Sequence, residues 1–228
     1  MRTTRPTGTT DPAPAAPTPT HPGQRRPWRT DRLTTLWMIV SLLVATLVLL
    51  VHDLLPQPLW TAIHVVTLGI LTNAIFQWSW FFARALLHLP SSDTRSGRDA
   101  ALRVLLLNGS FLALVVGMWG AHPWLVVAGA TLIGTVAAWH GLALVGAMRT
   151  RLGNRFAVVI RYYVAASAWL VLGCVLAGLI ALAMFDPSAP PWLVSARDRM
   201  TLSHALVNLA GWVGLSMAGT LVTLGPTM

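Results

Sequence analysis

The sequence predicts an all-α membrane protein, a bundle of six transmembrane helices. The chain of 228 residues is 55% hydrophobic and only 10% charged, with a mean hydropathy of +0.64. Soluble domains carry about 25% charged residues, so this composition favours lipid as the solvent. Six apolar runs are each long enough to cross a hydrocarbon core of about 30 Å. They cover residues 33–51, 58–83, 101–121, 123–148, 156–184 and 201–224.

The first 32 residues differ from the rest of the chain. They are rich in Pro, Thr and Arg and hold too few apolar side chains to form a core, so residues 1–32 are expected to be a disordered basic arm ahead of a membrane domain over 33–228. The Arg25-Arg26 pair is not followed by a convincing small-residue cleavage site. The first apolar run is therefore interpreted as an uncleaved anchor.

The arginines predict the orientation of the bundle. Cytoplasmic segments of membrane proteins carry an excess of basic residues. Besides the arm, the second-to-third connection contains Arg84, Arg95, Arg98 and Arg103, and the fourth-to-fifth contains Arg149, Arg151 and Arg155. We expect these segments and both termini to lie in the cytoplasm, with the chain in a bacterial plasma membrane. The basic residues behind the net charge of +9 are thereby explained by the orientation in the membrane, and nucleic acid is not an expected partner.

Histidines inside the spans are the candidate functional residues, because polar side chains in lipid are costly and often functional. His64 lies six residues after Pro58, and His204 lies three residues after Thr201, the expected start of the sixth helix. At a rise of 1.5 Å per residue, they lie about 9 Å and about 5 Å below the outer face. His140, counted in the same way, lies about 25 Å down. We therefore expect His64 and His204 to share one depth in the outer leaflet.

Two imidazoles from different helices at one depth are what a bis-histidine haem b requires. Each Nδ1–H also needs a partner, and Thr67 and Asn208, one turn below the two histidines, lie near the right face. Gly211, further along the sixth helix, is expected to leave room for a flat macrocycle. Arg197 and Arg199, immediately before that helix, are expected to bind the haem propionates.

Other interpretations of these histidines stay open. His64 and His204 can be hydrogen-bonded packing residues, and packing is the favoured interpretation of His140. Imidazole also suits copper, so a copper site formed by His52, His64, His122 and His204 is an alternative. The single cysteine, Cys174, lies in an apolar run and excludes both a disulfide and a covalent c-type haem.

Residues 203–228, SHALVNLAGWVGLSMAGTLVTLGPTM, carry the pattern H-x-x-x-N-x-x-G-W-x-G…G-T…P-T. This run resembles haem-copper oxidase subunit I relatives, including cbb-type oxidases and the NnrS family. The matching residues are His204, Asn208, Gly211, Trp212, Gly214 and Gly219. Over residues 33–228 the chain resembles the membrane region that precedes cupredoxin domains in actinobacterial multicopper oxidase or nitrite-reductase-like proteins.

The resemblance implies an electron-transfer module with haem b between the second and sixth helices. In such a module His64 and His204 bind the haem, and electrons pass from a membrane donor such as quinol to an extracytoplasmic copper protein or domain. The chain lacks an H-x-H pair, the copper-binding histidine triad and the cupredoxin ligand set, so it is not expected to be a catalyst alone.

Two alternatives belong to other functional classes. The first is a six-helix anchor or assembly partner for a copper domain, with histidines used for packing. The second is a metal or small-molecule transporter. The transporter is disfavoured, because the sequence shows no broken helix, inverted repeat or charge at the middle of a span.

Overall fold

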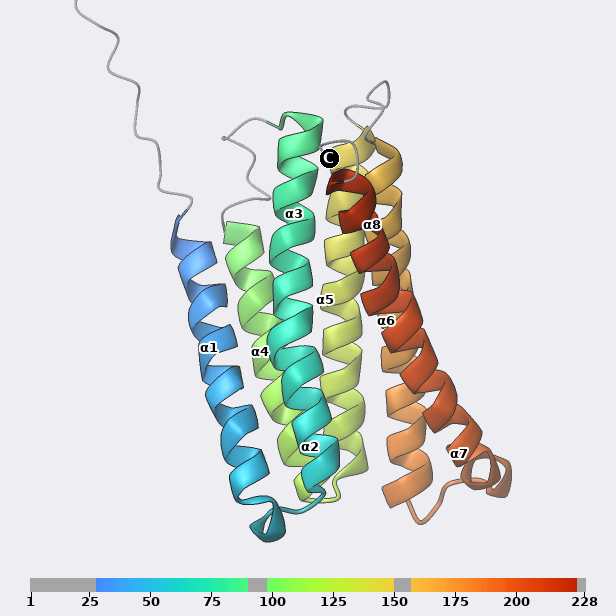
Figure 1. The fold of residues 1–228 in the computed structure, drawn as a ribbon. Helices are drawn as coiled ribbons and strands as arrows, with labels where there is room; N and C mark the ends of the chain where they lie inside the picture. Colours follow the sequence, from blue (N-terminus) through green and yellow to red (C-terminus); the bar gives the residue numbers. More distant parts are fainter. Residues whose placement is uncertain (1–27, 90–97, 150–156, 225–228) are drawn as a thin grey trace, which may run out of the picture.

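The computed structural model describes residues 28–89, 98–149 and 157–224, and throughout these ranges the ordered elements are helices (Figure 1). Six helices in this part of the chain are long and apolar enough to cross a membrane, which confirms the all-α fold and the six spans and indicates a multi-pass membrane protein. The elements are α1 (Trp28–Leu50), η1 (His52–Leu54), α2 (Pro58–His64), η2 (Val65–Thr72), α3 (Asn73–Leu87), α4 (Arg98–Trp119), α5 (Pro123–Arg149), α6 (Ala157–Phe185), α7 (Pro191–Leu206), η4 (Val207–Gly214) and α8 (Leu215–Leu224).

The helices form an up-and-down bundle with two distinct ends. Figure 1 shows that α1 begins and α8 finishes at the same end, which we call the terminal end; α3 and α5 also finish there. The opposite end, where α2, α5 and α7 begin at prolines, is the hairpin end. Proline suits the first turn of a helix, because the N–H group that it lacks has no partner there.

Three sequence-based boundaries are wrong. α1 begins at Trp28, inside the expected arm; residues 1–27, and the disorder expected of them, lie outside the described residues. α3 continues to Leu87, four residues past the expected end. The largest difference is in the sixth span, because α7 begins at Pro191, ten residues before the expected start at Thr201. Arg197 and Arg199 therefore lie within α7 and not before it.

Arg103 also departs from expectation, because it is not part of a cytoplasmic connection. It lies on α4, where 3% of its surface is exposed. The carbon of its guanidinium group lies 5.2 Å from the ring of Trp80 and 5.7 Å from the ring of Trp139. Indole faces attract a cation, so the two tryptophans stabilise a charge in a mostly apolar environment.

The second and sixth spans each contain a π-helical segment, η2 and η4, which the sequence did not predict. π turns leave carbonyl groups with altered partners, and they occur often at functional sites. At η2, side chains at the end of the segment and just after it donate hydrogen bonds to carbonyl groups of the segment. Thr72 Oγ1 donates to Thr67 O at 2.9 Å, and Asn73 Nδ2 donates to Leu68 O at 3.0 Å and Gly69 O at 3.1 Å.

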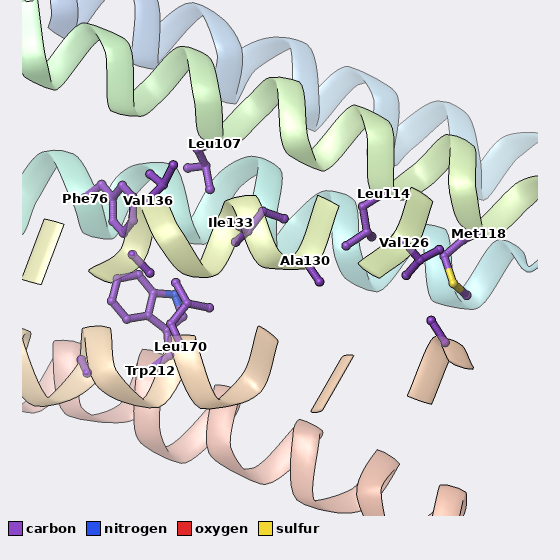
Figure 2. Packing of buried hydrophobic residues seen from close by; sticks show 13 residues of the cluster. Phe76, Leu107, Leu114, Met118, Val126, Ala130, Ile133, Val136, Leu170 and Trp212 are labelled. Atoms are coloured by element: carbon purple, nitrogen blue, oxygen red, sulfur yellow. The ribbon is translucent and has the colours of Figure 1, made fainter. Parts of the chain in front are cut away.

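α5 lies at the centre of the packing, between α4 and α6 (Figures 1 and 2). A Cβ atom added at Gly134 would lie 3.2 Å from Cys174 Cβ, and one at Gly141 would lie 3.1 Å from Ser167 Cβ. Small residues let neighbouring membrane helices approach closely, which is how helices associate without a hydrophobic force between them. Around α5, Figure 2 shows Phe76, Leu170 and Trp212 meeting in the buried cluster.

Candidate functional site

His64, at the end of α2, and His204, in the last turn of α7, lie beside each other. Their ring centres are 6.3 Å apart and their ring planes are inclined by 18°. Both side chains are partly buried. The structure therefore brings together, from the second and sixth spans, the two histidines that sequence depth had paired.

Each histidine is oriented by a backbone carbonyl. His64 Nδ1 lies 2.8 Å from Trp60 O, one turn earlier on α2, and His204 Nδ1 lies 2.9 Å from Gly173 O on α6. A carbonyl only accepts hydrogen bonds, so Nδ1 carries the proton in both rings and Nε2 carries the lone pair. Within the described residues neither Nε2 atom has a hydrogen-bond partner. This is the tautomer that binds a metal through Nε2.

The sequence-based choice of Nδ1 partners was wrong for Thr67. Its hydroxyl donates to Ile63 O at 2.8 Å, within its own helix. Asn208 does contact the predicted histidine, since its Nδ2 donates to His204 O at 2.8 Å and lies 3.3 Å from His204 Nδ1. Both of these nitrogen atoms are donors, so Asn208 supports the helix beside His204 and the carbonyl of Gly173 accepts the ring proton.

Gly211 has a packing role that differs from the expected one. A Cβ atom there would lie 2.5 Å from Trp169 Cγ, so the indole of Trp169 on α6 occupies the space that the missing side chain leaves. The expectation that Gly211 leaves room for a macrocycle is therefore wrong for this packing. Gly173 has a similar role, because a Cβ atom there would lie 2.5 Å from the amide group of Asn208.

The two arginines expected near the haem propionates differ in their positions on α7. Arg197 precedes His204 by seven residues, so it lies two turns away on the same face of the helix. Its Nε donates to Asp198 Oδ1 at 3.2 Å in an exposed ion pair. Arg199 precedes His204 by five residues and lies on a different face. Of the pair, Arg197 is the one whose position suits an anion above His204.

Among the described residues, the other histidines do not join this pair. His140 is almost completely buried on α5, stacks on Phe76 with ring centres 4.3 Å apart, and has Nε2 2.9 Å from Ser79 Oγ. His52 is exposed, with Nε2 3.1 Å from Asp53 Oδ1, and His122 is exposed as well. Within residues 28–89, 98–149 and 157–224 no three His, Cys, Asp or Glu side chains gather as a metal site. The four-histidine copper set is thus not assembled.

Two further participants were missed from the sequence. Trp60 stacks on His64, with ring centres 4.1 Å apart and planes inclined by 22°. The spacing of one helical turn between these residues was available as a signal. Gly173 contributes only its carbonyl, for which a sequence pattern carries no signal.

Comparisons with known protein families, curated proteins and solved structures find no match for this chain. The resemblance to haem-copper oxidase relatives therefore rests on the residues of the sixth span, and the function is argued from the site itself.

Proposed function

We propose that the chain is a membrane-embedded haem b electron-transfer module in which His64 and His204 would hold the haem. The separation of their rings supports this most directly. Two imidazoles that held one metal ion between them, each with its nitrogen at about 2 Å and its ring centre about 1 Å further away, would have ring centres about 6 Å apart. The observed separation of 6.3 Å is close to that value.

The hydrogen bonds of the two rings also support the proposal. Metal-binding imidazoles usually donate their second N–H to a carbonyl or carboxylate, which fixes the ring orientation and makes the ligand more basic. Both Nδ1 atoms meet this condition, through Trp60 O and Gly173 O. The two carbonyls come from different helices, so α2 holds one ring and α6 holds the other.

When bound, haem supplies one-electron redox chemistry, and the chain's own residues define how that chemistry is used. With both His64 and His204 holding it, the haem would serve electron transfer and not oxygen reduction. Trp60 covers one face of His64. Arg197, on the His204 face of α7, is placed to pair with a propionate.

The orientation in the membrane and the electron-transfer partners follow from the arginine distribution and from the resemblance noted in the sixth span. We propose that both termini lie in the cytoplasm of a bacterium and that the hairpin end faces outward across the plasma membrane. Electrons would then pass from a membrane donor to an extracytoplasmic copper protein or domain. The arginine-rich segments before α1 and between α5 and α6 support this orientation.

The test is the reduced-minus-oxidised absorption spectrum of the full chain purified in detergent, with haem quantified after extraction. We expect a haem b spectrum that is lost in both His64→Ala and His204→Ala. His140→Ala and His52→Ala are matched controls and should retain the haem. Loss of haem in His140→Ala alone would contradict the assignment.

A six-helix anchor for a copper domain is the second candidate. It is supported by the packing beside the histidines, where Trp169 covers Gly211 and the amide of Asn208 covers Gly173. For this candidate, the purified chain should be colourless and contain no iron, yet form a folded helical bundle. His64→Ala and His204→Ala would then change stability only.

A further inference from the structure

Trp60 contacts His64 through both its backbone and its side chain. Its carbonyl accepts the Nδ1 proton of His64 at 2.8 Å, and its indole stacks on the imidazole with ring centres 4.1 Å apart and planes inclined by 22°. The two residues are four apart on α2, so they lie one turn from each other on the same face of the helix. One residue therefore restrains both the direction of the Nδ1–H bond and the plane of the ring.

The stacked indole restrains the plane of His64 more narrowly than the hydrogen bond does. The torsion between Cβ and the ring of a histidine has only broad intrinsic preferences. A carbonyl oxygen also accepts hydrogen bonds over a broad range of directions, so the bond to Trp60 O alone would let the ring tilt. A flat surface in contact with the ring does not, because rotation would drive the edge of the imidazole into the indole.

The first turn of α2 is held in place by hydrogen bonds and packing. Trp119 Nε1, at the end of α4, donates to Thr61 Oγ1 at 2.9 Å, and Thr61 Oγ1 donates to Gln57 O at 3.0 Å. Thr61 is buried, and the partly buried indole of Trp60 packs against the main hydrophobic cluster. The indole of Trp60 can therefore act as a fixed surface for the imidazole.

His140 offers a comparison within the same chain. It also stacks on an aromatic ring, that of Phe76, with ring centres 4.3 Å apart and planes inclined by 13°. Its Nε2, however, lies 2.9 Å from Ser79 Oγ, so this ring is engaged by the protein. Among the described residues, His64 combines an aromatic stack with an Nε2 atom that has no hydrogen-bond partner. The stack on His64 thus orients a ring whose Nε2 lone pair is available.

The ring of His204 lies nearly parallel to that of His64, with planes inclined by 18°. Its own orientation is restrained from another helix, since its Nδ1 donates to Gly173 O on α6 at 2.9 Å. The angle between two imidazoles that hold one haem influences the iron, because each ring splits the iron d orbitals along its own plane. Nearly parallel rings add their effects, whereas perpendicular rings cancel them.

We propose that Trp60 is a positioning residue that sets the plane of the His64 ring, so that the chain presents two nearly parallel imidazoles to the haem. This inference rests on the proposed function and deepens it. Ligand orientation and the surroundings of the ligands are means by which a protein adjusts a haem iron. Trp60 acts on that iron only through His64.

The test is the low-temperature EPR spectrum of the oxidised full chain in detergent, with the optical spectrum and the haem content recorded on the same samples. For the wild type we expect a rhombic low-spin signal, which nearly parallel imidazoles produce. Trp60→Leu keeps the carbonyl and removes the flat surface, so its signal should broaden and its largest g value should rise. Trp60→Phe restores a flat surface and should restore the wild-type signal. Trp124→Leu, an exposed tryptophan at the start of α5, is the control and should leave the signal unchanged.

A strongly anisotropic wild-type signal, as given by perpendicular imidazoles, would overturn this inference while leaving the haem assignment intact. A signal from Trp60→Leu identical to that of the wild type would do the same. Loss of haem from Trp60→Leu that Trp60→Phe reverses would support the need for a flat surface, whereas loss from both variants would contradict it. A wild type without haem contradicts the proposed function itself, and this inference with it.

Discussion

The indole Nε1 of Trp212 in η4 donates a hydrogen bond of 3.1 Å to Thr72 Oγ1 in η2, and so joins the two spans that carry His64 and His204. Thr72 Oγ1 in turn donates to Thr67 O at 2.9 Å. The three groups form a short chain of hydrogen bonds in which each polar atom is satisfied. The hydrogen bond between Trp212 and Thr72 therefore connects the two π-helical segments directly.

Thr72→Val should lower the stability of the bundle by about 1–2 kcal/mol, because it leaves the buried Trp212 Nε1 and Thr67 O without this partner. Reversible unfolding in mixed detergent measures the change. Thr135→Val is the matched control, because Thr135 is exposed and donates only to Thr131 O in its own helix. Equal losses in the two variants would show that the contact between the spans adds nothing.

Gly173→Ala should disturb the orientation of His204 and reduce haem content several-fold. The added Cβ atom would lie 2.5 Å from the amide of Asn208, which must move, and Gly173 O is the acceptor for His204 Nδ1. Haem per protein after purification is the measurement. Gly109→Ala on α4 is the control, because no heavy atom lies within 4 Å of the Cβ position there. Normal haem content in Gly173→Ala would contradict this role.

Asn73 and Asn108 should behave as one unit. Asn73 Nδ2 donates to Asn108 Oδ1 at 2.9 Å, and Asn108 Nδ2 donates to Asn73 Oδ1 at 3.0 Å, in a buried setting. Asn73→Leu and Asn108→Leu should each cost about 2 kcal/mol, because each leaves the other amide without its partner. The double variant should cost less than the sum, by about 1 kcal/mol or more. Additive losses in the unfolding cycle would contradict the coupling.

Asp186, just after α6, should titrate below the usual range for an aspartate. The side chain and the backbone N–H of Ser188 both donate to its Oδ1, at 2.7 Å and 2.8 Å, and these bonds lower the pKa of the carboxyl group. A depressed pKa favours the folded turn above the unfolded pKa of about 3.9, and that contribution is lost as the pH falls through the folded pKa. Ser188→Ala should raise the pKa of Asp186, as measured by NMR titration of its side-chain carboxyl.

Hydropathy and length were sufficient to predict the six spans, because lipid demands long apolar helices whatever their packing. The same signal gave the wrong start for α7. The polar run SARDR interrupts the apolar pattern there, although the helix already begins at Pro191. Counting depth from Thr201 therefore used the wrong helix start, although the two histidines do meet. Arg103 was assigned to a connection because the charge rule takes no account of the indoles that surround it.

The details of the site could be predicted only in part. His64, His204 and Asn208 carry a signal because polar side chains are rare in membrane helices. The carbonyls of Trp60 and Gly173 carry none, since every residue has a carbonyl and only the fold selects these two. The pairing of Ser79 with His140 likewise requires the relative rotation of α3 and α5.

The π segments have a consequence for the length of the spans that carry them. Each inserts an additional residue into a helical turn, and one residue corresponds to a rotation of about 100° around the helix axis. His64 precedes η2, whereas Asn73, Phe76 and Ser79 follow it, and all four need inward directions. The π turn takes up the additional residue, whereas the same residues wound as a regular α-helix would turn the later three by about 100° relative to His64. The second span can thus not be wound as one regular α-helix of the same length without losing one of its two sets of contacts.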